Sequence, residues 1–231
     1  MKYLICYSLL TLPLLAVAAA PCETTQQCNA QGTQAYKAGH YPEAVEAFER
    51  QLRRAELAEN ATERELALNN LMLATLKAGQ PGMARAWLEV ALEAQMNGVA
   101  TRHNLAKLGA QDLSALTASA EGHYLRYGGQ AVWSTLTINR AKDGSYRAEF
   151  SPLRVGAKVE EYGPAAIGEL EGRLSGEGDY FSLEEAGLAP GCAVQVLRDG
   201  LRLRVVEVFA EGCQDYGGAN ISVGGRYYKA R

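Results

Sequence analysis

Residues 193–206 read Ala-Val-Gln-Val-Leu-Arg-Asp-Gly-Leu-Arg-Leu-Arg-Val-Val, which is the clearest hairpin pattern in the second half of the chain. After Gly200, leucine and valine alternate with Arg202 and Arg204, which is the period of a strand with one buried face. Asp199-Gly200 can supply the two positive-φ residues of a tight hairpin turn. The stretch predicts two antiparallel strands, and a two-residue turn at Asp199-Gly200 places Cys192 opposite Glu207.

Short alternating runs separated by turn residues continue through the chain from residue 121 onward. Asp143-Gly144 and Gly176-Glu177-Gly178 predict further turns. We expect strands near 122–128, 131–140, 145–150, 156–162, 165–175, 179–185, 192–198, 201–209 and 221–229. Such a series without helices between the strands predicts a closed barrel or a sandwich. We favour the barrel, because the turns are short and closure removes exposed edges.

Two irregularities interrupt the strand pattern. Val205-Val206-Glu207-Val208 breaks the alternation, which indicates a bulge. The glycine pairs of residues 215–226 suggest a phosphate loop, but neither Lys-Ser/Thr nor a helix follows them. We therefore interpret these glycines as bulges or close crossings of the backbone.

The end of the chain resembles small disulfide-bonded barrels of exported bacterial proteins. The resemblance rests on Cys213, the turn Gly217-Gly218 and a closing strand, Gly225-Arg226-Tyr227-Tyr228-Lys229. Some of those barrels are similar to periplasmic lysozyme inhibitors. No inhibitory motif carries over residue by residue. The resemblance therefore implies only an alternative function, an inhibitor or immunity protein for a cell-wall hydrolase that acts through barrel loops.

The part of the chain before the strands has helical periodicity. Between residues 27 and 108, apolar residues recur three and four positions apart in a sequence rich in Ala, Leu, Glu, Gln and Arg. Pro42 and Pro81 suit the first turn of a helix, and Asn60 with Glu63 suits a helix cap. We expect five helices, near 25–38, 42–59, 61–78, 81–96 and 99–108, with room for a short sixth before residue 120.

The helical pattern occurs twice and resembles a pair of tetratricopeptide repeats. Gly39, Ala44, Phe48 and Leu52 recur forty residues later as Gly79, Ala84, Leu88 and Leu92. The spacing departs from the family's period of about 34. Cys28 and Leu68 replace the usual first-helix aromatic, and Met72 stands where a small residue is typical.

The resemblance implies a concave face that binds proteins or peptides, or a scaffold for the other domain. Such a face is lined by the first helix of each pair. The partner-binding residues that we predict are Gln34, Lys37, Asn69, Asn70 and Lys77.

The N-terminus has the pattern of a secretory signal peptide: Met1-Lys2, an apolar stretch, and Ala18-Ala19-Ala20. The stretch is short for a membrane span, so we expect cleavage near residue 20 and a periplasmic mature protein. Pro21 replaces the small residue that precedes a lipid-modified cysteine, which argues against a lipid anchor at Cys22.

Four cysteines follow the predicted cleavage site, and an even number in an exported chain favours disulfides. Of the three possible pairings, loop closure and the domain split favour Cys22 with Cys28 and Cys192 with Cys213. No Cys-x-x-Cys pair occurs, and the three histidines have no ligand-like spacing, so we predict no metal.

Charge and motifs exclude several classes of function. Residues 21–110 carry 9 Lys and Arg against 10 Asp and Glu, and residues 111–231 carry 13 against 16. Neither part has the basic excess of a nucleic-acid or membrane-surface binder. Gly-x-Ser-x-Gly is absent, and His123 at a strand start suits a half-exposed position better than catalysis. We predict no enzyme activity and no cofactor.

The sequence thus predicts an α+β protein of two domains after a signal peptide at 1–20. Residues 21–110 form the helical domain, 111–120 a linker and 121–231 the antiparallel barrel. We expect a non-catalytic protein-binding or assembly factor, because helical repeats of this kind present partner-binding surfaces.

Overall fold

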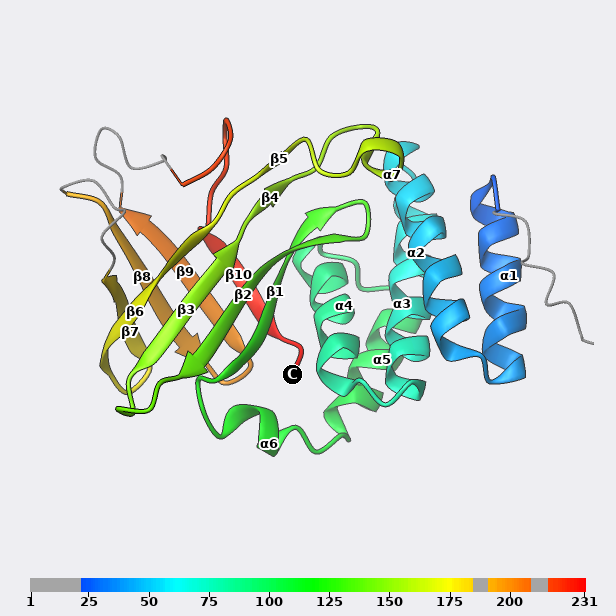
Figure 1. The fold of residues 1–231 in the computed structure, drawn as a ribbon. Coiled ribbons are helices and arrows are strands. Elements are labelled where there is room, and N and C mark those ends of the chain that lie inside the picture. Colours follow the sequence, from blue (N-terminus) through cyan, green and yellow to red (C-terminus); the bar gives the residue numbers. More distant parts are fainter. Residues whose placement is uncertain (1–21, 185–190, 209–215) are drawn as a thin grey trace, which may run out of the picture.

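The computed structural model describes residues 22–184, 191–208 and 216–231. The predicted signal peptide and Cys213 lie outside the described residues. A helical region is followed by a closed antiparallel barrel, which confirms the α+β class (Figure 1). The two parts lie side by side, with α4 (Pro81–Glu93) next to the barrel and α1 (Thr25–Ala38) farthest from it.

The long helices lie where the apolar periodicity predicts them. Besides α1 and α4, they are α2 (Tyr41–Leu57), α3 (Ala61–Lys77) and α5 (Val99–Gly109), and the short α6 (Ser114–Thr117) follows. The Asn60 side chain accepts a hydrogen bond from the Glu63 amide at 3.1 Å, as the predicted cap requires. Gly39 ends α1 at φ 81°, a conformation that favours glycine.

The helices pack closely because small residues stand at their crossings. Ala44 and Ala84, the repeated small residues of the sequence pattern, are fully buried. Gly32 lies against the ring of Phe48, and a Cβ atom at position 32 would stand 2.4 Å from Phe48 Cε1. A side chain there would push the ring aside, so α1 depends on this glycine for its approach to α2.

Eight strands close the barrel. They are β1 (Gly122–Gly129), β2 (Val132–Arg140), β3 (Tyr146–Ser151), β6 (Leu170–Glu177), β7 (Tyr180–Glu184), β8 (Ala193–Asp199), β9 (Arg202–Val208) and β10 (Gly225–Lys229). Their order around the barrel is β1-β10-β9-β8-β7-β6-β3-β2. The closing strand that the resemblance implied is β10, which joins β9 to β1.

The β8–β9 hairpin differs in register from the prediction. Asp199 pairs with Arg202, so the turn residues are Gly200 and Leu201, and Glu207 lies opposite Val194. The predicted pairing of Cys192 with Glu207 was therefore wrong by two positions. Gly200 has φ 59°, which suits a turn whose first residue is glycine.

The predicted bulge at residues 205–208 was also wrong. β9 pairs with β8 without a shift from Arg202 to Val208, whereas a register shift occurs in β1, between Tyr127 and Gly129. The break in the apolar alternation at Glu207 has a different cause. The Glu207 carboxylate accepts hydrogen bonds from the hydroxyl groups of Tyr216 and Ser222 near the end of the barrel.

The predicted strand at 156–162 is a helical turn, α7 (Val159–Tyr162), between the short strands β4 (Leu153–Arg154) and β5 (Ala166–Ile167). A strand needs alternating burial, but only Val159 is buried here. Arg53 of α2 pairs with Glu160 at 3.0 Å, which holds the turn against the helices.

The glycine-rich segment makes a close crossing of the backbone, as predicted. Gly217 bridges to Gly168, and a Cβ atom at position 217 would stand 3.0 Å from the Gly168 Cα. No side chain fits between these two backbone segments, so this crossing requires glycine.

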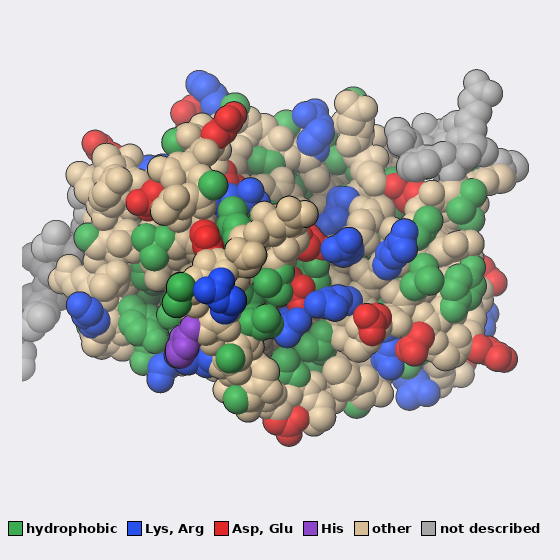
Figure 2. Space-filling model, turned by 180° about the vertical axis from the view of Figure 1, so that it is seen from behind, with side chains coloured by type: hydrophobic (Ala, Val, Ile, Leu, Met, Phe, Trp, Pro, Cys, Tyr) green, Lys and Arg blue, Asp and Glu red, His purple; other side chains and the backbone are tan. Residues whose placement is uncertain are grey.

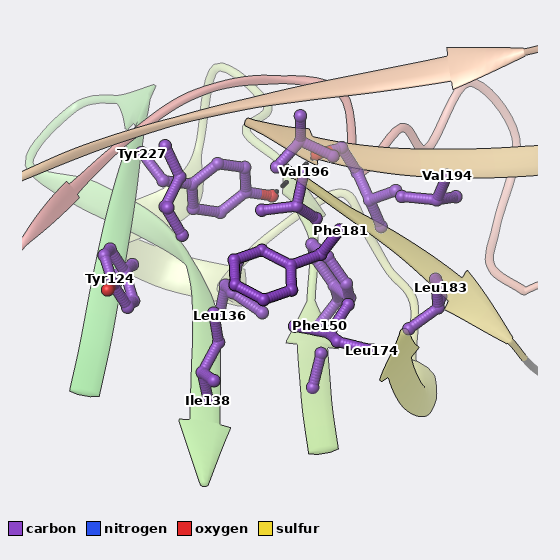
Figure 3. Close-up of a cluster of buried hydrophobic side chains, with 14 of the residues drawn as sticks. Tyr124, Leu136, Ile138, Phe150, Leu174, Phe181, Leu183, Val194, Val196 and Tyr227 are labelled. Carbon is purple, nitrogen blue, oxygen red and sulfur yellow. Dashed lines mark hydrogen bonds between the residues drawn. The ribbon is translucent and has the colours of Figure 1, made fainter. Parts of the chain in front are cut away.

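The barrel interior is a packed core. Figure 3 shows side chains from strands all around the barrel meeting inside it, among them Tyr124, Leu136, Phe150, Val196 and Tyr227. These five side chains are at most 1% exposed. The barrel therefore resembles small barrels that are filled by their own side chains rather than those that enclose a ligand.

Candidate binding surfaces

The outer face of β1 and β2 packs against the helices through an aromatic cluster. Trp87 of α4 lies edge to face with Trp133 of β2, with ring centroids 4.7 Å apart, and with Tyr127 of β1 at 6.0 Å. Trp87 is fully buried. This cluster joins the two parts of the molecule, and it removes one side of α4 from contact with partners.

Hydrogen bonds to Glu56, which we call the Glu56 clamp, hold the tip of the β1–β2 hairpin beside the aromatic cluster. The carboxylate of Glu56, in α2, accepts hydrogen bonds from the Tyr127 hydroxyl at 3.0 Å and from the Gln130 amide at 2.5 Å. Burial and the nearby Glu56 charge raise the pKa of Tyr127 well above its usual range. Arg53 donates to the Gln130 carbonyl at 3.2 Å, so α2 is also engaged by the barrel.

The predicted binding residues lie on α1 and α3, which are the first helices of the two predicted helix pairs. Gln34, Lys37 and Lys77 are exposed. None of these three side chains has a hydrogen-bond or ion-pair partner among the described residues. Asn70 is partly exposed, and its amide donates to Asn29 Oδ1 of α1 at 2.9 Å. Asn70 thus lies at the line of contact between the two first helices.

Asn69 is the exception among the predicted binding residues. It is only 3% exposed, and its amide donates to the Thr101 hydroxyl at 2.9 Å and to the Glu65 carbonyl at 2.8 Å. Asn104 donates to Asn69 Oδ1 at 2.7 Å. The polar atoms of Asn69 are therefore used to attach α5 to α3, and the prediction that Asn69 faces a partner is corrected.

The disulfide predictions are supported as far as the described residues reach. Cys22 and Cys28 form a disulfide with Cα atoms 5.0 Å apart, which ties the chain to the first turn of α1. Cys192 is also disulfide-bonded. Its predicted partner, Cys213, lies outside the described residues.

A cleft of about 610 Å³ runs between α4 and the outer face of β8, β9 and β10. Four arginines line it, Arg198, Arg202, Arg204 and Arg226, together with Glu89, Glu93, Asp199 and Tyr228. Figure 2 shows Lys and Arg side chains gathered in the middle of this face, with acidic side chains among them. The alternation in the sequence places Arg202 and Arg204 on one face of a strand. The order of the strands in the barrel brings Arg226 and α4 next to that face.

A second cleft of about 600 Å³ lies where the start of α4, the α6 segment and the chain end meet. His123 lines it, and its Nδ1 atom lies 3.2 Å from the Thr137 hydroxyl. Burial, and next the charge of Arg231, lower the pKa of His123 below its ordinary value. The other side chains lining this cleft include Met83, Leu113, Leu116 and Leu125, so its walls are mainly apolar.

The described ranges contain no group of three or more His, Cys, Asp or Glu that could hold a metal ion. They also contain no helix with the length and apolar character that a membrane span needs. No family model, no curated protein and no solved structure matches this chain.

Proposed function

We propose that this is an exported, non-catalytic protein-binding or assembly factor that contacts its partner through α1 and α3. The proposal follows the likeness of the helical region to tetratricopeptide repeats, in which the first helices bind partners. It also places the mature protein in the periplasm, in agreement with the N-terminal pattern and with a Cys22–Cys28 disulfide.

One observation carries the proposal. The barrel covers α4 and engages α2, whereas the exposed Gln34, Lys37 and Lys77 of α1 and α3 have no side-chain hydrogen-bond or ion-pair partner among the described residues. Leu66 of α3 is 39% exposed, and it is four residues from Asn70 and eleven from Lys77. These spacings put the three side chains on one side of the helix, where apolar contact and positive charge can act together.

The experiment is site-specific photo-crosslinking in the native envelope with the full-length protein. A photoreactive amino acid replaces Lys77 or Leu66 on α3 and, as the control, Arg147 on β3, which is also exposed. We expect a defined crosslinked protein from both α3 positions and none from Arg147. The double variant Lys37→Glu/Lys77→Glu should weaken partner binding by about 1 to 3 kcal/mol if both cations meet carboxylates.

Crosslinks that arise only from barrel positions would contradict this proposal. In that case the inhibitor or immunity protein for a cell-wall hydrolase becomes the first candidate, because recognition then lies in the barrel.

A further inference from the structure

We propose that the cleft between α4 and strands β8, β9 and β10 is a separate recognition site, which binds an acidic segment of a partner protein through Arg204 and Arg226. The site lies on the barrel side of α4, away from the α1 and α3 surface. An experiment on this cleft can therefore succeed or fail independently of the experiment on the α1 and α3 surface.

The register of the strands places two arginines directly opposite each other. Arg204 of β9 pairs directly with Arg226 of β10, and Leu197 of β8 pairs with Arg204. The neighbouring inward positions, Val196 and Val205, are buried, so Leu197, Arg204 and Arg226 form one row on the outer face. Side chains directly opposite in such a pair start about 5 Å apart, and like charges there are destabilising.

Three of the four arginines that line the cleft are paired with acidic side chains. Arg202 lies 2.8 Å from Glu89 of α4, Arg226 lies 3.3 Å from Glu93, and Arg198 lies 2.8 Å from Asp179. Arg204 is exposed and has no hydrogen-bond or ion-pair partner among the described residues. It is therefore the cation of this cleft that is available to a ligand anion, and a carboxylate between Arg204 and Arg226 would relieve their repulsion.

The cleft distinguishes Arg204 and Arg226 from a second pair of arginines on the barrel. The second pair, Arg147 and Arg173, lies on β3 and β6, which are opposite β9 and β10 in the closed barrel. Arg147 already pairs with Glu171 at 2.9 Å. The cleft beside α4 includes neither of these two arginines. Arg204 and Arg226 instead face α4 across a volume of about 610 Å³, within the range of ligand sites.

Apolar side chains near Arg204 indicate the class of ligand. Leu197 is 37% exposed beside Arg204, and Leu92 of α4 lines the same cleft. Carboxylates next to apolar side chains fit such a surface. The barrel is closed, so a peptide cannot add as a strand and must be recognised by its side chains. The four arginines that line the cleft outnumber its three acidic residues, Glu89, Glu93 and Asp199, so the cleft favours an acidic partner.

The test is fluorescence anisotropy with the full mature protein and a fluorescein-labelled peptide of alternating Glu and Leu. We expect binding with a dissociation constant below about 1 mM, weakened by added salt, and no binding of the matched peptide with Gln in place of Glu. Arg204→Glu should weaken binding about tenfold or more. It should not lower the melting temperature, because the new carboxylate pairs with Arg226.

The matched control is Arg173→Glu, which makes the same change of charge opposite Arg147 on the other side of the barrel. It should leave peptide binding unchanged. If Arg204→Glu fails to fold, Arg204→Gln removes the cation without adding an anion and tests the same contact.

Three outcomes would overturn the proposal. They are the absence of peptide binding to the native protein, equal binding of the Glu and Gln peptides, and equal losses from Arg204→Glu and Arg173→Glu. Binding of an oligonucleotide or of anionic lipid vesicles through Arg204, without peptide binding, would also overturn it, since the ligand class would then be wrong.

Discussion

At the scale of single residues, Asn69 and Asn70 show how neighbours in one helix take opposite roles. Asn69 lies inside the α3–α5 contact, where its amide meets Thr101 and Asn104, while Asn70 lies at the α1–α3 contact and is partly exposed. Successive helical residues lie about 100° apart around the axis, so one can be buried while the next faces outward.

Replacement of these two asparagines by alanine should therefore have unequal effects. Asn69→Ala leaves the buried Asn104 amide without its acceptor, and we expect a loss of about 1 to 3 kcal/mol in the free energy of unfolding. Asn70→Ala should cost no more than about 0.5 kcal/mol. Urea denaturation of both variants checks this, and equal losses would show that the Asn69 network contributes little.

His123 gives the protein a dependence of stability on pH. Its pKa is lowered in the folded state from 6.5, because burial and Arg231 disfavour the charged ring. The unfolded state then binds more protons, so this contribution is present above pH 6.5 and is lost as the pH falls through the folded-state pKa.

The melting temperature should therefore decrease when the pH is lowered from about 7.5 to about 5, and His123→Gln should reduce that decrease. Thr137→Val keeps the imidazole and removes its hydrogen-bond partner at 3.2 Å, so it serves as the control and should retain the pH dependence. An unchanged slope in His123→Gln would assign the effect to other groups.

At the scale of elements, the β1–β2 hairpin connects the barrel to the helices. Inward residues such as Leu136 belong to the barrel core, whereas Trp133 on the outer face packs on Trp87. One hairpin therefore contributes to two apolar clusters, which explains why both faces of β2 are largely covered.

Trp133→Ala should lower the free energy of unfolding by about 1.5 to 3 kcal/mol, because a partly buried aromatic side chain is lost from the aromatic cluster. Tyr180→Ala is the matched control. Tyr180 is also aromatic on a strand, but it is 46% exposed, so we expect a change within about 0.5 kcal/mol. Guanidinium denaturation measures both. A small loss for Trp133→Ala would mean that the contact between the helices and the barrel is not held by the aromatic cluster.

At the scale of the whole molecule, the helical and barrel regions have separate cores and a shared contact. The α6 segment links them, and its end is attached to the barrel, since Lys229 Nζ donates to the Ser119 carbonyl at 2.9 Å. Lys229 is only 3% exposed, and burial lowers its pKa. The predicted linker 111–120 is thus held at its C-terminal end, while the predicted domain limits stay a prediction.

Cleavage at a protease site inserted in α6 should give two fragments that remain associated. The aromatic contact of Trp87 with Trp133 and the Glu56 clamp join them without the covalent link. Size-exclusion chromatography after cleavage checks this, and the same cut in Trp133→Ala should release the fragments. Separation of the two fragments of the otherwise unchanged protein would show that the contact between the helices and the barrel is weaker than its packing implies.

Local sequence patterns predicted the long helices and most strands of the barrel, but not the helical turn α7. Apolar residues at helical spacing, the Pro42 and Pro81 starts and the Asn60 cap fixed the helices, because these signals act over a few residues. Alternation in residues such as Leu203 and Val205 fixed the strands, and short turns favoured closure into a barrel. Each of these depends on local chemistry, which the order of residues contains.

The register of the β8–β9 hairpin and the make-up of the surfaces depend on tertiary contacts. A shift of two residues in a hairpin leaves the same faces buried, so the alternation cannot distinguish a turn at Asp199-Gly200 from one at Gly200-Leu201. The burial of Asn69 depends on where α5 packs, and the meeting of Arg204 with Arg226 and α4 depends on strand order. These contacts join residues far apart in the chain, and local patterns do not contain them.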